Sequence, residues 1–495
     1  MKRILLTLVS LAFCWVLHGQ NVPTFHSEKV ESSALYIGGN DFQKDLLLYI
    51  DMLTATHPYY ADAKHCAQLQ KKVKKMYKEC GKIDDVVQFK VYLAKVASAL
   101  NDGHTAVVYF NEFETFFPIR FDLDGTGSAV IDICPEEHKE LLGKAVKSIN
   151  GKSINQILAL ARPLISADND VSFTNTVKEY LMFNKFWSLL GMSEDVLRLI
   201  LTDGSQVEIP AIKRGELEIA QLQRNLEQRV TAKRSVLFDY EIFEKQSICY
   251  LQFNQFADRI THPKHTQLAR FDEFVSDMML DMKSKSIQTL VVDLQYNSGG
   301  NSILGEVLLS WLYQHKDLQN VGVDVRISEL LYAHYPYYRN FTVGGQFLKV
   351  GEIYDFWGFD HSKDYKMDYS VPQDPNKHIL NLDNDKIFKG NVIFIQGRDS
   401  FSSATLLLTL ARDNGIGKII GQRAGGKPCH YGDVLYCQLP QTQTLATVSH
   451  KYFRRPNIGL KDMDYIEPDV TIDLGNSEKD LAWEWIVENY GVAAD

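Results

Sequence analysis

The sequence predicts a multidomain α/β protein with its largest α/β domain in the C-terminal half. The chain has 495 residues, and at about 150 residues per domain this length corresponds to roughly three domains. Its composition, with 45% hydrophobic and 23% charged residues, is that of an ordinary folded protein. From about residue 234 onward, short apolar runs alternate with amphipathic segments, and this pattern is typical of strands and helices packed in layers.

The balance of charges argues against a nucleic-acid partner. The net charge is −9, whereas a surface that binds phosphates needs an excess of basic residues. Even the lysine-rich stretch Lys71–Lys75 is interpreted as the solvated face of a helix, because the surrounding protein is acidic. We therefore expect no nucleic-acid partner.

The first 20 residues have the features of a secretion signal. Lys2 and Arg3 precede the apolar stretch Ile4–Leu17, and the chain becomes polar at His18. The stretch is too short to span a bilayer comfortably as a mature helix. No later segment reaches about 18 uninterrupted apolar residues either. A retained N-terminal anchor is the alternative. We expect residues 1–20 to be a signal peptide, the mature protein to be periplasmic or extracellular, and no stable membrane insertion.

Six cysteines remain once Cys14 is removed with this segment. An even number in an oxidising compartment permits disulfides, and a Cys429–Cys437 bond would close a short hairpin. Cys249 lies in the apolar run Ile248–Phe253 and is expected to be a buried free thiol. The sequence has no paired Cys-x-x-Cys motif to support a metal site at Cys429, His430 and Cys437. We therefore predict no metal and no other cofactor.

Residues 35–106 are predicted to form a helical N-terminal domain. Asp41 is the expected cap of a first helix, which ends before Pro58. A second helix is expected around Gln68–Tyr77. A third, Val86–Leu100, stops at an Asn-Asp-Gly turn.

Residues 107–233 are predicted to form a small β-rich module. Val196–Leu201 and Val207–Ile209 flank an Asp-Gly turn, which is a signal for a hairpin. Residues Ala145–Lys152 predict a strand and a turn that lead into a helix near Asn155–Ala161.

Residues 234–490 are predicted to form the large α/β domain. Thr289–Leu294 is almost continuously apolar, as expected for a strand of a parallel sheet that is covered on both faces. An aromatic-rich insertion, at about 321–385, either lines a substrate cleft or packs as an irregular subdomain. The other expected elements are Ile248–Phe253 (strand), Leu304–Tyr313 (helix), Val392–Gln396 (strand), Ser403–Arg412 (helix) and Lys418–Gly421 (strand).

Three segments carry candidate catalytic residues. Ser400–Ala404 lies between a predicted strand and a predicted helix, where a serine hydroxyl is exposed and the helix N-terminus favours an oxyanion. Serine is also a favoured helix cap. Asn297–Gly300 ends in paired glycines, which either bring backbone N–H groups to a ligand or form an ordinary connection. In Asn101–Thr105, His104 lies in a turn after a helix, where a single histidine is usually just solvated.

Together and in this order, the segments resemble the tail-specific (C-terminal-processing) serine protease family, whose relatives include the tricorn core protease. The resemblance is closer to the tricorn-like branch and covers most of the chain after the signal segment. No motif is specific alone, and it is their shared order that carries the resemblance. The motifs are Asp-Gly-His-Thr at 102–105, Asp-Leu-x-x-Asn-x-Gly-Gly at 293–300, Ser-x-Ser-Ser-Ala at 400–404, Gly-Gly-Lys-Pro at 425–428 and Glu-Pro-Asp at 467–469.

The resemblance implies a helical N-terminal domain, a PDZ-like peptide-binding module and a crotonase-like α/β catalytic domain. It implies an exported serine endopeptidase that cleaves peptides or unfolded proteins through an acyl-enzyme on Ser402. The backbone N–H of Ser403, with that of Gly299 or Gly300, would hold the oxyanion. The alternatives are an inactive peptide-binding or scaffold protein of the same fold and an esterase-like acyl hydrolase, although a Gly-x-Ser-x-Gly elbow is absent around Ser402.

The resemblance leaves two candidates for the general base. His104 occupies the histidine position of the tricorn-like branch, and Lys427 matches the lysine position of the processing branch. The complete motif around His104 favours the histidine, and Pro428 and Cys429 depart from the context of the processing branch. Lys427 would then hold the active-site turn in place.

The tricorn-like branch also implies an acidic group near the C-terminus that orients the catalytic residues. Asp462 is our candidate, and Asp464 and Glu467 are the alternatives. The match is approximate, because that branch has a glutamate there. The oligomeric state, the cleavage preference and a gating role of residues 321–385 are left open by the sequence.

Overall fold

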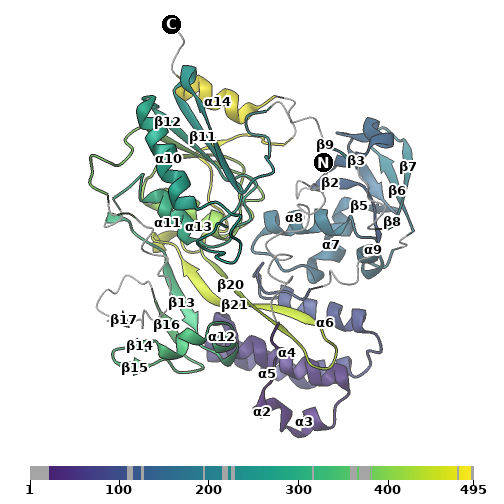
Figure 1. Cartoon of the computed structure of the whole chain (residues 1–495). Coiled ribbons are helices and arrows are strands. Elements are labelled where there is room, and N and C mark those ends of the chain that lie inside the picture. Colours follow the sequence, from purple (N-terminus) through teal and green to yellow (C-terminus); the bar gives the residue numbers. More distant parts are fainter. Residues whose placement is uncertain are drawn as a thin grey trace. The chain divides into compact units, whose positions relative to one another are not determined.

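The computed structural model describes residues 22–108, 115–123, 127–192, 195–213, 221–223, 229–314, 317–356, 365–366, 380, 382–475 and 479–491 (Figure 1). The predicted signal peptide lies outside these ranges. So do Trp357 and Phe359, two of the aromatic residues of the predicted insertion.

The chain divides into two compact units that interleave along the sequence. Unit 1 contains Met1–Arg224, Val323–Asp368 and His430–Phe453, and unit 2 contains Asn225–Gly322, Tyr369–Cys429 and Arg454–Asp495. Parts of the predicted C-terminal domain therefore occur in both units. The predicted domain boundaries themselves stay predictions.

The helical part of unit 1 forms as the sequence predicts. Helix α4 (Asp41–Thr56) begins one residue earlier than expected, because the side chain of Asn40 accepts the Gln43 N–H and the Gln43 side chain accepts the Asn40 N–H. Asn40, and not Asp41, is therefore the cap. The other helices are α2 (Glu28–Glu31), α3 (Ala34–Ile37), η2 (Pro58–Ala61), α5 (Ala63–Cys80) and α6 (Val86–Ser98).

The β-rich part of unit 1 contains the predicted hairpin and several helices. Strands β6 (Val196–Leu201) and β7 (Gln206–Pro210) pair antiparallel across the Asp-Gly turn, where Gly204 has a φ of +87° that favours glycine. The sheets follow the orders β5-β4-β6-β7, β2-β3-β9 and β1-β8. The remaining elements are β1 (Thr115–Phe116), β2 (Arg120–Leu123), β3 (Ala129–Pro135), η4 (Glu136–Leu141), β4 (Val146–Ile149), β5 (Lys152–Ser153), α7 (Ile154–Ala161), η5 (Arg162–Leu164), α8 (Asp170–Tyr180), α9 (Asn184–Leu189), β8 (Ile212–Lys213) and β9 (Gln221–Gln223).

A further sheet of unit 1 has the strand order β16-β13-β21-β20. Its long strands β20 (His430–Gln438) and β21 (Leu445–Arg454) form an antiparallel pair. The described part of the aromatic insertion contributes β13 and β16 to this sheet, and its other strands form a separate sheet of order β15-β14-β17. The elements of the insertion are β13 (Gly322–Arg326), α12 (Glu329–His334), η9 (Pro336–Asn340), β14 (Thr342–Val343), β15 (Gln346–Phe347), β16 (Ile353–Asp355) and β17 (Tyr365–Lys366).

The Cys429–Cys437 disulfide that the cysteine count permitted does not form. Cys429 immediately precedes β20 and Cys437 lies near the end of that strand, and an extended strand rises about 3.3 Å per residue. The two cysteines are thus held far beyond the 4.4–6.8 Å or so between Cα atoms that a disulfide needs. Both are free thiols, as is the buried Cys249, which confirms the prediction for that residue.

Unit 2 is built on a six-stranded sheet of order β10-β11-β12-β18-β19-β22. All neighbouring strands run parallel except the edge pair β10 and β11. Every residue of β12 is buried, as its apolar run predicts. The strands are β10 (Phe238–Phe243), β11 (Ile248–Phe253), β12 (Thr289–Asp293), β18 (Asn391–Gln396), β19 (Lys418–Gly421) and β22 (Val470–Thr471).

Helices pack against this sheet. Ala482 and Ile486 of α14 (Leu481–Tyr490) join a buried cluster with strand residues such as Val291 and Ile393. Helix α10 (Phe271–Ser284) packs on α11 (Ile303–Leu309), which packs on α13 (Ser403–Asp413) (Figure 1). Short 3-10 turns are η7 (Glu244–Gln246) and η11 (Ile458–Leu460).

The parallel strands bring two of the predicted site segments to one edge of the sheet. β12 ends at Asp293 and β18 ends at Gln396, and as neighbours in parallel register they deliver the chain to the same edge. Loops at the carboxyl ends of such strands are where open α/β sheets bind ligands. Gly299–Gly300 follows the first strand and Ser402 follows the second.

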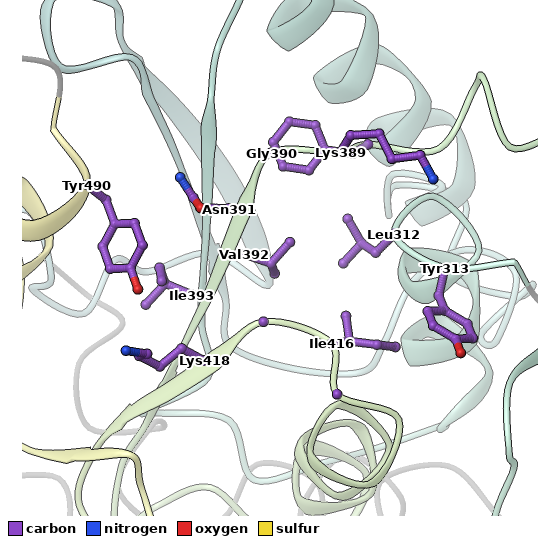
Figure 2. Close-up of a pocket in the computed structure, with 13 residues that line it drawn as sticks. Leu312, Tyr313, Lys389, Gly390, Asn391, Val392, Ile393, Ile416, Lys418 and Tyr490 are labelled. Atoms are coloured by element: carbon purple, nitrogen blue, oxygen red, sulfur yellow. The ribbon is translucent and has the colours of Figure 1, made fainter.

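A hollow of about 450 Å³ lies at the opposite edge of the same sheet. Figure 2 shows it beside the first residues of β18 and β19, Asn391 and Lys418, with Tyr490 of α14 at its margin. None of the predicted site residues lines this hollow. The candidate site therefore lies in the loops at the carboxyl edge of the sheet.

None of the helices in the described ranges combines the length and apolar character that crossing a bilayer requires.

Candidate active site

Ser402 lies at the turn between β18 and α13 in a strained backbone conformation. Its φ is +51° and its ψ is −120°, a region that residues with a Cβ rarely adopt and that costs about 1–3 kcal/mol. Its side chain makes no capping hydrogen bond to α13, so the role of an ordinary helix cap does not account for this serine. Such strain is typical of functional sites, where the fold imposes one side-chain direction.

The neighbouring serines, Ser400 and Ser403, make hydrogen bonds that stabilise the turn. The buried hydroxyl of Ser400 donates to the Leu294 carbonyl at 2.8 Å and accepts the Gly397 N–H at 3.0 Å. The hydroxyl of Ser403 donates to the Gly300 carbonyl at 2.6 Å. These bonds join the β18–α13 turn to the loop that follows β12. They single out Ser402 among the three serines.

The glycine pair lies directly against this turn. A Cβ on Gly299 would come within 2.7 Å of the Ser402 Cβ and 3.0 Å of the Ser403 nitrogen. Gly299 and Gly300 have φ values of +102° and +132°. Both the positive φ and the close approach require glycine here.

Asn297 organises the glycine loop from inside. Its fully buried side chain donates to the Phe253 carbonyl at 2.7 Å and accepts the Gly299 N–H at 2.8 Å. Its backbone carbonyl accepts the Phe401 N–H at 3.0 Å. Since the Gly299 N–H is used inside the loop, Gly300 is the better partner for Ser403 as an oxyanion donor.

His104 belongs to unit 1 and lies in a turn that is held by Asp102. The fully buried Asp102 carboxylate accepts the backbone N–H of His104 at 2.9 Å, and its Oδ1 lies 3.5 Å from Nδ1 of the imidazole. Asp102 lies on the Nδ1 side of the ring, so a proton held on Nδ1 would leave Nε2 as the basic nitrogen. The arrangement is therefore that of an acid orienting a histidine base.

Asp102 is itself held by three further donors. His57 donates through Nε2 at 3.1 Å, and its Nδ1 accepts the Tyr59 N–H, which fixes the ring's tautomer. The hydroxyls of Thr105 and Ser449 donate at 2.5 and 2.7 Å. Burial alone would raise the pKa of Asp102, but the hydrogen bonds and charges of His104 and His57 outweigh it and hold the pKa well below its ordinary value.

Lys427 is tied to a carboxylate of its own unit. Its Nζ lies 2.8 Å from Oδ1 of the exposed Asp464. A Cβ on the preceding Gly426 would come within 3.2 Å of the Ser402 nitrogen, so this segment supports the strained turn. An ion pair uses the ammonium form of lysine, whereas a general base needs the free amine.

The predicted C-terminal acids are exposed. Asp462 is exposed on the segment that carries Asp464. Glu467 forms an ion pair with Arg423 at 2.7 Å. Both belong to unit 2, whereas the carboxylate found beside His104 is Asp102 of unit 1.

A second buried carboxyl group lies beneath the glycine loop. Asp293, the last residue of β12, accepts hydrogen bonds from the Tyr250 hydroxyl and from the backbone and side chain of Gln295. Burial raises the pKa of Asp293 to about 6 in spite of these bonds. Its native state therefore retains a proton at pH values where the unfolded chain has lost it.

We predict that Asp293→Asn changes how stability depends on pH. The raised pKa of Asp293 favours folding at low pH, and this contribution disappears as the pH rises from about 4 to about 6. Asparagine does not titrate, so the variant should gain about 2–3 kcal/mol relative to the parent between about pH 4 and pH 7. Urea unfolding midpoints of both proteins at the two pH values measure this gain. Parallel pH dependence would contradict the assignment.

One group of unit 1 side chains has a composition that suits a cation. Ligand atoms of Asp102, His104 and Asp168 all lie within 4.8 Å of one another and are buried. However, both oxygens of Asp102 already accept hydrogen bonds. The donor set fits the orientation of an imidazole better than the coordination of a metal.

Sequence reasoning missed three residues of this arrangement. Asp102 and Asn297 are polar residues of the motifs Asp-Gly-His-Thr and Asp-Leu-x-x-Asn-x-Gly-Gly. Their place in these motifs was a signal from which a buried structural role could have been predicted. Asp168, which accepts the Gly103 N–H, lies outside every motif, and the sequence offers no signal for it.

The comparisons with known proteins agree with this picture. Residues 247–472 match peptidase family S41. Mature CPAF is similar in structure at 14% identity, with 92% of this chain and 96% of CPAF covered and a TM-score of 0.61. A complex of mature CPAF with lactacystin gives 14% identity, 92% and 97% coverage and a TM-score of 0.60. No curated protein sequence matches the chain.

Fold and family together define the class of this protein as a serine-type peptidase with a mixed α/β multidomain fold. The match to peptidase family S41, whose members are tail-specific proteases, spans residues 247–472, most of the predicted catalytic domain.

Proposed function

We propose that this protein is an exported endopeptidase that hydrolyses peptide bonds of peptides or unfolded proteins through an acyl-enzyme on Ser402. The observation that carries the proposal is the strained turn of Ser402 at the N-terminus of α13, packed against Gly299. A nucleophile needs an accessible hydroxyl and nearby oxyanion donors. Ser402 is only half-buried, and the Ser403 nitrogen lies beside the glycine pair.

In the proposed reaction, His104 takes the proton of the Ser402 hydroxyl while Oγ forms a bond to the peptide carbonyl carbon. The N–H groups of Ser403 and Gly300 stabilise the oxyanion, a contribution worth about 10²–10³ in rate per donor. The imidazolium then gives its proton to the amine as the C–N bond breaks, which leaves the acyl group on Ser402. Water, deprotonated by His104, then attacks the acyl carbon, the bond to Oγ breaks, and Oγ regains the proton from the imidazolium. Asp102 orients the imidazole in this scheme.

Lys427 remains the alternative base, and the proposal gives it a supporting role. Its ion pair with Asp464 and the contact of Gly426 with the Ser402 turn favour support over proton transfer. A role for Asp462 as the orienting acid stays a prediction.

The proposal includes a crotonase-like catalytic domain and a PDZ-like module that binds peptide. The parallel sheet of unit 2 and the small antiparallel sheets of unit 1 favour these two assignments. Export rests on the predicted signal peptide, residues 1–20, whose basic and apolar segments are typical of secreted proteins.

We expect the mature protein to cleave casein and a peptide with a free C-terminus, and to turn over a p-nitrophenyl ester far more slowly. Mass spectrometry of the products locates the cut, and an internal cut identifies an endopeptidase. A fluorophosphonate probe should label Ser402. Ester hydrolysis without peptide cleavage would favour an esterase-like enzyme, and peptide binding without any cleavage or labelling would favour an inactive scaffold.

A further inference from the structure

Asp168 connects the turn of His104 to a distant part of unit 1. Its Oδ1 accepts the backbone N–H of Gly103 at 2.7 Å, across 65 residues of sequence. Gly103 lies between Asp102 and His104, so this bond holds the turn at its centre. The carboxylate is only 3% exposed, and a buried hydrogen bond to a charged acceptor is stronger than one between neutral groups.

The segment that delivers this carboxylate is itself immobilised. Ile165 and Ala167 are buried between η5 and α8. Asn169, the next residue after Asp168, caps α8 through a reciprocal pair of bonds with Ser172. The position of Asp168 is thus set by the packing of α8 and not by the histidine turn.

Asp168 also lies against the imidazole itself. One of its oxygens, a ring nitrogen of His104 and an oxygen of Asp102 all lie within 4.8 Å of one another. The ring is therefore flanked by two buried carboxylates that come from separate segments of the chain. At this range an opposite charge strongly favours the protonated form of an imidazole.

We infer that Asp168 is a positioning residue for His104: it fixes the turn through the Gly103 N–H and places a second negative charge beside the ring. The inference rests on the proposed function, in which His104 is the general base. Asp102 orients the imidazole from within the turn, and Asp168 anchors the turn to α8.

The other charged groups around the ring support this role. Burial lowers the pKa of His104, but Asp102, Asp168 and Asp433 outweigh burial, and the pKa is raised above its ordinary value. Lys451 lies 2.6 Å from Asp433 and offsets part of its charge. His430 stacks on the His104 ring with centroids 5.8 Å apart. His57 bonds to Oδ2 of Asp102, whereas Oδ1 is the oxygen that lies 3.5 Å from the His104 ring nitrogen. Asp168 is therefore a principal source of the shift besides Asp102.

The test compares Asp168→Asn with Asp168→Ala. Asparagine retains an acceptor for the Gly103 N–H and removes the charge, whereas alanine removes both. We expect Asp168→Asn to move the acidic limb of the pH profile of kcat/KM to lower pH by about one unit. Asp168→Ala should also lower kcat by about 10²-fold, because the base is misplaced. Asp170→Asn is the matched control, since Asp170 is exposed and pairs with Arg162, and it should leave the profile unchanged.

A measurement that is independent of activity separates this inference from the proposed function. NMR titration of His104 in the full-length mature chain, carrying Ser402→Ala, reports the imidazole pKa directly, and His104→Gln assigns the signal. Adding Asp168→Asn should lower this pKa by about one unit, whether or not peptides are cleaved. An unchanged pKa in the folded variant would overturn the inference, and so would an equal shift in Asp170→Asn. Circular dichroism verifies the fold of each variant.

Discussion

Replacing Ser402 with alanine should abolish peptide hydrolysis and leave the fold intact. The substitution removes only the hydroxyl, which makes no capping bond to α13, and alanine meets the same backbone strain at φ +51° as serine does. We expect kcat/KM to fall by at least about 10⁴-fold, as for other enzymes that lose a serine nucleophile. Peptide cleavage assays together with thermal unfolding curves measure the two parts of this prediction.

Ser403→Ala is the matched control for this experiment. It removes the hydroxyl that donates to the Gly300 carbonyl but keeps the backbone N–H proposed for the oxyanion. A lost hydrogen bond of about 1 kcal/mol corresponds to no more than about tenfold in rate. Parental turnover by Ser402→Ala, or a larger loss in Ser403→Ala than in Ser402→Ala, would refute the assignment of the nucleophile.

Replacing His104 with alanine should have the second largest effect. The ring lies in a turn that Asp102 holds through the His104 N–H, and the carboxylate lies beside the ring. A solvated loop histidine would not have such a buried carboxylate at its ring. Loss of a general base typically costs about 10²–10⁴-fold in rate, and we expect a loss toward the upper end. The measured quantity is kcat/KM of the folded variant on the peptide that the parent cleaves.

Lys427→Ala provides the contrast, because it removes the rival base from a partly exposed ion pair with Asp464. We expect this variant either to keep most of its activity or to lose activity and thermal stability together, because the segment of Lys427 supports the Ser402 turn. If Lys427→Ala is inactive but stably folded while His104→Ala remains active, the lysine is the base and the proposed mechanism fails.

Local patterns in the sequence determined the elements and their order. Apolar runs such as Thr289–Leu294 predicted buried strands, because burial on both faces of a parallel sheet leaves little room for polar residues. The five motifs predicted a peptidase, and residues 247–472 match peptidase family S41. Helix caps were harder to predict from the sequence. Asp41 was chosen instead of Asn40, because the side chains of both residue types accept hydrogen bonds from backbone N–H groups at a helix start.

The tertiary structure alone decided which side chains act together. Ser400, Ser402 and Ser403 have the same chemistry in the sequence, and they differ only through bonds to a loop about a hundred residues away. Asp102 and Asp168 gained their roles in the same way, from partners as distant as Ser449. Such contacts depend on side-chain directions and on chain paths that local periodicity does not encode. The chain path also excludes the Cys429–Cys437 disulfide. The two cysteines are close in the sequence, but an extended strand separates them in space.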